Sequence, residues 1–185
     1  MKIEISNYIK KYQEALERVD WAGVERLLED LRQIRISGKT VYLFGNGGSA
    51  ANAMHWANDL LYPLTKSGGK PIRALALTAD VATLTCLGND IGYDQIFAFQ
   101  LDSLAVKGDL VIALSGSGNS ANIHQALRVA KEKQLTSYAI LGYDGGQAKK
   151  LASRVLHLPA HDMQLAENFQ LMVCHLVLQT LEAET

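Results

Sequence analysis

The stretch 44–61, FGNGGSAANAMHWANDLL, constrains the fold of this chain more than any other. An apolar run that ends at Phe44 is followed by a glycine-rich loop and then directly by a helical pattern, which predicts a strand, a tight loop and the start of a helix. Glycines let backbone N–H groups approach a ligand closely, and the first turn of a helix offers unpaired N–H groups. The sequence therefore predicts an anion-binding corner here.

A second segment repeats this organisation. The apolar run 110–114 is followed by a glycine and serine loop, SGSGNS, and by a helical pattern over residues 121–133. The hydroxyls of Ser115, Ser117 and Ser120, with the backbone N–H groups around them, form a suitable nest for a phosphate monoester. The alternative interpretation is a serine-rich helix cap without a ligand.

Both loops match the spacing of a dinucleotide-binding fingerprint, through Gly45-x-Gly47-x-x-Ala50 and Gly116-x-Gly118-x-x-Ala121. The acidic residue that this fingerprint places about 20 positions further on is absent, and neither loop has the Lys-Ser/Thr pair of a nucleoside triphosphate loop. A phosphate monoester is therefore the better candidate ligand.

Strands and helices alternate along the chain with short connections. We expect strands at residues 41–44, 72–77, 110–114, 137–141 and 154–158. We expect helices at residues 49–62, 93–105, 121–133 and 163–182, and two amphipathic helices before the first strand. The stretch 78–90 ends in Gly88-Asn89-Asp90, whose polar groups we expect at the mouth of a loop. This order predicts an α/β fold with a parallel sheet covered on both faces, whose glycine loops lie at the carboxyl ends of their strands.

Composition narrows the classes of function. The 185 residues suit one domain over residues 1–185, 48% of them are hydrophobic, and the net charge of −1 gives no broad basic surface for nucleic acid or an anionic membrane. No stretch predicts a membrane span or a signal peptide, so we expect a cytoplasmic protein that binds neither nucleic acid nor membrane directly. The two cysteines, Cys86 and Cys174, lie in apolar surroundings and are predicted to be reduced core residues.

The ordered motifs GNGGSAANAMH, GND and SGSGNS resemble the SIS (sugar isomerase) domain family, and most of all its phosphoheptose isomerase branch. The resemblance implies a three-layer sandwich with a five-stranded parallel sheet between helices, in a homotetramer with active sites at subunit interfaces. Residues 1–37 would then be a helical extension used in oligomerisation. Members convert sedoheptulose 7-phosphate to D-glycero-D-manno-heptose 7-phosphate, for the heptose of surface polysaccharides such as lipopolysaccharide.

The resemblance also implies substrate-binding residues. Those positions are Asn46, Gly47, Gly48, Ser49, Asp59, Asn89, Asp90, Ser115, Gly116, Ser117, Ser120 and Glu167. The phosphate loop of the family usually has the sequence Ser-Thr-Ser-Gly-Asn-Ser. Gly116 stands where threonine is usual, so this chain lacks one of the hydroxyls that the family offers to its ligand.

A zinc site is the cofactor that the resemblance implies. The family takes its ligands from a His and a Glu four residues apart and from a Gln and a His eight apart, which correspond here to His55, Asp59, Glu167 and His175. Both substituted residues keep an oxygen donor that suits zinc. Residues 167 and 175 are separated by roughly 12 Å along a regular helix, so one ion could bind both only through converging side chains, an irregular helix or ligands from different chains. From the residues alone, a lone histidine in an apolar helix, such as His175, is more often a core histidine bonded to a neighbour.

The expected reaction is a ketose-to-aldose isomerisation through an enediolate. The resemblance makes Asp59 and His175 the acid and base candidates, and Glu167 is a rival because a group bound to metal is a poorer base. Three alternatives stay open: a non-catalytic scaffold that binds the bacterial replication initiator, a sensor of sugar phosphates, and a metal-independent isomerase of another phosphorylated sugar.

Overall fold

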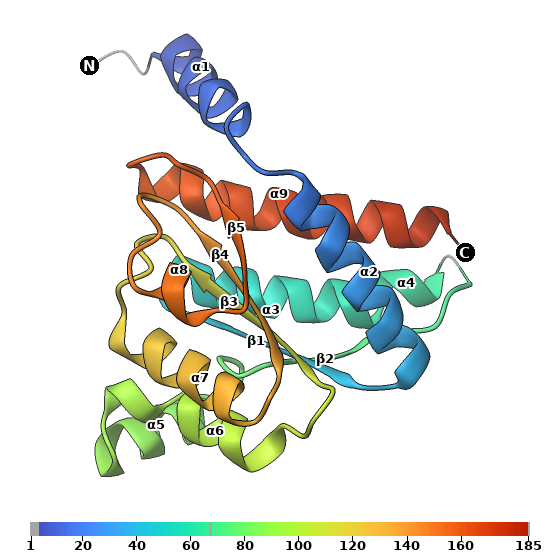
Figure 1. The fold of residues 1–185 in the computed structure, drawn as a ribbon, viewed down its shortest axis with the longest axis vertical. Helices are drawn as coiled ribbons and strands as arrows, with labels where there is room; N and C mark the ends of the chain where they lie inside the picture. The colour runs from blue at the N-terminus through green and yellow to red at the C-terminus, as the bar shows by residue number, and fades with distance from the viewer. Residues whose placement is uncertain (1–3, 67, 185) are drawn as a thin grey trace.

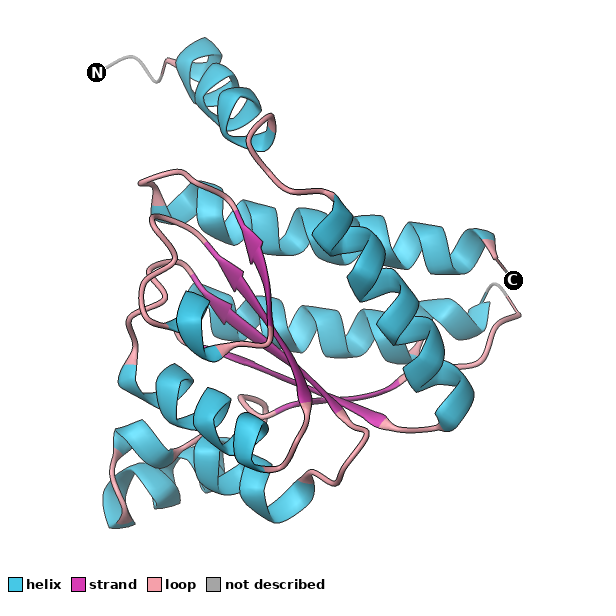
Figure 2. Ribbon diagram, in the orientation of Figure 1, coloured by secondary structure: helices cyan, strands magenta, loops and turns pink. Residues whose placement is uncertain are grey.

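Five parallel strands form the middle layer of the computed structural model, which describes residues 4–66 and 68–184 (Figures 1 and 2). In chain order the strands are β1 (Thr40–Gly45), β2 (Arg73–Ala76), β3 (Leu110–Ser115), β4 (Thr136–Leu141) and β5 (Arg154–His157). Their order in the sheet is β2-β1-β3-β4-β5. The predicted five-stranded parallel sheet is confirmed.

Helices cover both faces of the sheet (Figure 1). One face carries α2 (Ala22–Ser37), α3 (Gly48–Leu61), α4 (Pro63–Lys66) and α9 (Met163–Ala183). The other carries α5 (Val81–Asp90), the 3₁₀ helix η1 (Tyr93–Gln95), α6 (Ala98–Leu104), α7 (Ala121–Glu132) and α8 (Ala148–Leu151). Among the described residues, no helix is both long and apolar enough to span a membrane.

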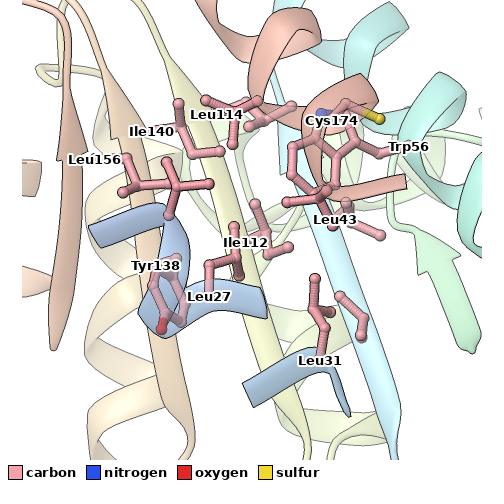
Figure 3. Close-up of a cluster of buried hydrophobic side chains, with 14 of the residues drawn as sticks. Leu27, Leu31, Leu43, Trp56, Ile112, Leu114, Tyr138, Ile140, Leu156 and Cys174 are labelled. Atoms are coloured by element: carbon pink, nitrogen blue, oxygen red, sulfur yellow. The ribbon is translucent and has the colours of Figure 1, made fainter. Parts of the chain in front are cut away.

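Alternating side chains of the central strands supply the two halves of the core. In β1, Val41 and Leu43 face the layer of α2, α3 and α9, whereas Tyr42 and Phe44 face the layer of α6 and α7. Figure 3 shows Leu27 and Leu31 projecting from α2 toward the side chains of the strands. A sheet buried on both faces explains why its strands appear in the sequence as continuous apolar runs.

The first helix, α1 (Ile5–Leu16), extends from one end of the molecule (Figure 1). Ala15 is its only buried residue, and Ile5 and Ile9 are exposed. Its contacts with the rest of the chain are made mainly near the start of α9, where the Lys11 ammonium lies 2.6 Å from the Asp162 carboxylate. Within the predicted helical extension, α2 is therefore a layer of the core, whereas α1 contributes to the core only near its C-terminal end, through Ala15.

One helix was not predicted, and two local predictions are wrong. The stretch 78–90 contains α5, which begins where the Asp80 carboxylate accepts hydrogen bonds from the backbone N–H groups of Ala82 and Thr83. The helix expected over residues 93–105 is divided into η1 and α6. Cys86 is exposed on α5, whereas Cys174 is buried, and both thiols are free.

The connections of the sheet create one crevice. From β1 the chain crosses to β2 on one side, and β3 lies on the other side of β1, so the order of the strands reverses between β1 and β3. Open α/β sheets bind ligands beyond the carboxyl ends of their strands at such a point. The loops that follow β1 and β3 are the two glycine loops of the sequence.

Leu31 tests whether α2 is part of the core. Its side chain is fully buried, so the substitution Leu31→Ala should reduce the free energy of unfolding by about 2–5 kcal/mol, measured by denaturant titration. Gln33→Ala, at an exposed position of the same helix, is the matched control and should change it by no more than about 0.5 kcal/mol. Equal small effects of both variants would show that α2 is not docked on the sheet.

Candidate active site

A pocket of about 280 Å³ lies between the two glycine loops. Its lining combines both loops with the first turns of α9: Asn46, Gly47, Gly48, Ser49, Leu114, Ser115, Gly116, Ser117, Ser120, Met163 and Glu167. Most of the predicted substrate-binding residues therefore meet in one place. Glu167 is the only ionisable residue in that lining.

The serine loop is arranged to donate hydrogen bonds. The Ser115 hydroxyl accepts a bond of 3.0 Å from the backbone N–H of Gly118, and the Ser117 hydroxyl accepts one of 3.2 Å from Asn119. A hydroxyl that accepts one bond still has its own proton to donate. Ser120 precedes α7 without capping it, so its side chain is also free for a ligand. Three hydroxyls at a helix N-terminus suit a phosphate group.

Two side chains of α9 fit against the two loops because the loops have glycine there. A Cβ atom at Gly48 would overlap the carboxylate of Glu167, and a Cβ atom at Gly116 would overlap the thioether of Met163. Met163 and Glu167 lie four residues apart and therefore on one face of α9. The Glu167 carboxylate thus lies at the N-terminal end of α3, where the helix dipole favours a negative charge.

Asn89 and Asp90 lie elsewhere in this chain. They end α5 at an exposed position, outside the residues that line the pocket, and the Asn89 side chain donates a hydrogen bond of 2.8 Å to the Asp90 carboxylate. The Cys86 thiol donates to the same carboxylate, which raises the pKa of the thiol. Tyr93, three residues further on, connects this region to the pocket through Asn46.

A second group of polar side chains joins α3 to α9. The Nε2 atoms of His55 and His175 are 3.0 Å apart, and the Asp59 Oδ2 atom lies 3.1 Å from the first and 4.0 Å from the second. Asp59 is buried, whereas the imidazoles are about half exposed, at 45% and 50%. Within residues 4–66 and 68–184, these three form a group whose donor atoms all lie within 4.8 Å of one another.

Further contacts hold Asp59 in this group. The Asn58 side chain donates a hydrogen bond of 3.2 Å to Oδ1, and the Cys174 thiol lies 3.9 Å from Oδ2. Burial, with the Asp59 charge beside it, raises the pKa of the Cys174 thiol, which therefore stays protonated and donates. The sequence predicts Cys174 only as a core residue, and its contact with Asp59 was not predicted.

Glu167 does not join this group within one chain. The helix α9 is continuous from Met163 to Ala183, so Glu167 lies roughly 12 Å from His175 along its axis, as the spacing predicts. The structure thus brings together three of the four predicted metal ligands and places the fourth in the pocket.

A buried amide that the sequence analysis missed fixes α9 against α3. The Gln170 side chain donates to the Ser49 hydroxyl at 3.0 Å and accepts from the Asn52 amide at 2.9 Å. The Trp56 indole donates to the Gln170 backbone carbonyl at 3.1 Å. The available signal was the helical spacing of Ser49, Asn52 and Trp56, which puts polar atoms on the buried face of α3.

Comparison with known proteins places the chain in a family. The SIS domain family matches residues 6–142. The phosphoheptose isomerase of Aliarcobacter butzleri is 36% identical over 97% of this chain and 90% of its own, and that of Helicobacter pylori strain 26695 is 34% identical over 96% of each. The solved phosphoheptose isomerase GmhA of Neisseria gonorrhoeae superposes with a TM-score of 0.87 at 28% identity, over 96% of this chain and 94% of its own. The chain therefore belongs to the SIS domain family, among the phosphoheptose isomerases.

Proposed function

We propose that the protein is an isomerase that converts sedoheptulose 7-phosphate to D-glycero-D-manno-heptose 7-phosphate. The observation that carries this proposal is the pocket itself, where three serine hydroxyls, an asparagine and a carboxylate meet at the switch point of the sheet. Relatives named phosphoheptose isomerase, similar over almost the whole chain, support the choice of substrate.

The reaction moves one proton between neighbouring carbons. A base removes a proton from C1 of the ketose, an enediolate forms, and a proton is returned to C2 while the C1 hydroxyl becomes the aldehyde. Negative charge develops on the C2 oxygen and needs a donor or a cation beside it. The protein must therefore hold the sugar, supply a base and stabilise that oxygen.

The serine loop binds the phosphate end of the substrate. Ser115, Ser117 and Ser120 surround the N-terminus of α7, and their hydroxyl protons are available to phosphate oxygens. Contacts so far from the reacting carbons position the sugar and convert binding energy into correct orientation.

The group of His55, Asp59 and His175 fits zinc. Two imidazole nitrogens and one carboxylate oxygen face a common point, and this donor set is one that catalytic zinc sites use with a further position left open. When bound, zinc would act as a Lewis acid toward the carbonyl oxygen. The half-exposed imidazoles leave room for a further ligand from another subunit.

Glu167 is the best placed of the three candidates for proton transfer. Asp59 is engaged by His55 and Asn58, and His175 faces both Asp59 and His55. The Glu167 carboxylate lines the same pocket as the serine hydroxyls and accepts no side-chain hydrogen bond from the described residues. Asp59 and His175 remain the candidates that the family motif supplies.

The active enzyme is, by this proposal, a cytoplasmic homotetramer with active sites at its interfaces, and it serves the synthesis of surface polysaccharide heptose, including that of lipopolysaccharide. Exposed apolar side chains near the His55 group support an interface there: Met54, Leu61 and Tyr62 on α3 and Leu176 on α9. No nucleic acid or membrane is a partner in this proposal.

A specific observation keeps a related phosphosugar as the second candidate substrate. The Met163 thioether occupies the space that a side chain at position 116 would take, so this pocket has a sulfur where the family usually has a threonine hydroxyl. Conversion of sedoheptulose 7-phosphate by the purified protein, with and without added zinc, tests the main proposal. Binding of the sugar phosphate without turnover would instead favour another ketose phosphate, or a scaffold or sensor.

Asp59→Asn tests the metal group. The variant keeps the shape of the side chain but loses its charge. Loss of a residue that only supports a metal ligand lowers metal affinity by roughly 10- to 100-fold, so loss of the ligand charge should lower zinc affinity at least as much, and turnover should be lost. Zinc titration by calorimetry and the melting temperature separate loss of metal from loss of fold. Asp102→Asn, a remote exposed acid, is the control. Unchanged zinc affinity in Asp59→Asn would contradict the site.

Ser120→Ala tests the phosphate contacts. Because Ser120 makes no capping bond, its removal should leave the fold unchanged, while a lost hydrogen bond to a charged phosphate should raise KM by about 10- to 100-fold. Ser37→Ala, an exposed serine on α2, serves as the control in the same assay. A KM equal to that of the wild type would exclude Ser120 from the phosphate site.

Glu167→Gln tests the base. The amide has the same shape but cannot take a proton, so kcat should fall by about 10²- to 10⁴-fold. KM should not rise, because a negative charge is removed from a pocket that receives phosphate. The two constants are measured with the zinc-loaded protein. A kcat close to that of the wild type would assign proton transfer to Asp59 or His175.

A further inference from the structure

Two asparagine side chains join the two glycine loops. Asn46, which follows β1, donates a hydrogen bond of 2.9 Å to the Oδ1 atom of Asn122 in the first turn of α7, and the Asn122 amide donates one of 2.9 Å back to Asn46 Oδ1. Asn122 is almost completely buried, with 2% of its surface exposed, and it does not line the pocket. Asn46 does line it.

The backbone fixes the orientation of this pair. The N–H of Ile123 lies 2.9 Å from one terminal atom of the Asn122 amide, and an N–H can bond only to the oxygen. The other terminal atom of Asn122 is therefore its nitrogen. Because the pair is reciprocal, the oxygen of Asn46 must face that nitrogen, and the nitrogen of Asn46 must face the Asn122 oxygen.

Tyr93 completes the coordination of Asn46. Its hydroxyl donates a hydrogen bond of 3.1 Å to Asn46 Oδ1, which already accepts from Asn122. An amide oxygen has two lone pairs and an amide nitrogen has two protons, so the Asn46 oxygen is saturated and one of its N–H groups is used. The second N–H has no protein acceptor among residues 4–66 and 68–184.

We propose that Asn122 is a positioning residue that holds Asn46 as a one-proton donor to an oxygen of the bound ketose phosphate, with Tyr93 as its second support. The proposal rests on the proposed function, since it takes the pocket to be the sugar-phosphate site. A fixed donor costs no reorganisation when charge develops on the substrate oxygen, so its contribution is larger in the transition state than in the ground state. Asn46 thereby acts as a donor only, and a substrate hydroxyl cannot donate to it.

The test is a double-mutant cycle on the full-length, zinc-loaded protein. Asn46→Ala and Asn122→Ala should each lower kcat/KM for sedoheptulose 7-phosphate by about 10-fold or more. In the double variant the second substitution should add less than about 2-fold, because Asn122 acts only through Asn46. Two effects that multiply independently would overturn the proposal, since a merely structural role of Asn122 does not depend on Asn46.

Two further variants keep the test decisive if Asn122→Ala unfolds the protein. Asn122→Asp still accepts from Ile123 and from Asn46, but it cannot donate to the Asn46 oxygen, so kcat per folded protein should fall. The melting temperature should also fall, because a carboxylate replaces an almost completely buried amide, and kcat is therefore measured where the variant is still folded. Tyr93→Phe, at an exposed position, removes the hydroxyl that donates to Asn46 and should lower kcat/KM by a smaller factor than the Asn122 substitutions do. Tyr8→Phe, on α1, is its control. Wild-type kcat in both Asn122→Asp and Tyr93→Phe would also overturn the proposal.

Binding measurements separate this inference from the proposed function. Dissociation constants for sedoheptulose 7-phosphate and for fructose 6-phosphate are measured by calorimetry on the same variants. If the wild type binds sedoheptulose 7-phosphate without turning it over, the proposed reaction fails, and weaker binding of either sugar by Asn122→Asp and Asn46→Ala still supports the positioning role. Equal affinity together with an unchanged kcat in those variants contradicts it. Absence of binding to both sugars in the wild type contradicts both proposals.

Discussion

The register between α3 and α9 depends on one buried side chain, the amide of Gln170. It bonds to Ser49 and Asn52, and its backbone carbonyl accepts from Trp56, so any slide of α9 along α3 would leave buried polar atoms unpaired. Everything that α9 contributes follows from this register. The turn before Gln170 places Glu167 in the pocket, and the turn after it places His175 beside His55.

Because α9 is straight, these two contributions stay apart. Glu167 and His175 lie at different heights along α9, separated by roughly two turns. The imidazoles of His55 and His175 are about half exposed, so a further subunit can supply an additional ligand beside them.

The sequence predicted what depends on local pattern, and it missed what depends on contacts between distant residues. The parallel sheet, the two loops and the His55–Asp59 spacing follow from periodicity and glycine placement. Helix α5 was not predicted, because its start depends on the Asp80 cap and Leu87 is its only buried residue. The roles of Asn122 and Gln170 could not be predicted, because each is defined by a partner more than 70 residues away in the sequence.

The departures from the family motif are connected through α9. Gly116 lacks the usual hydroxyl, but a side chain there would collide with Met163, just as one at Gly48 would collide with Glu167. Threonine at position 116 would therefore require the Met163 side chain, which lies on the same face of α9 as Glu167, to move out of that space. The glycine, the methionine and the carboxylate form one arrangement, in which a thioether and a carboxylate line the pocket beside the serine hydroxyls. A substrate preference different from that of other family members would arise from this arrangement as a whole, and not from any single substitution.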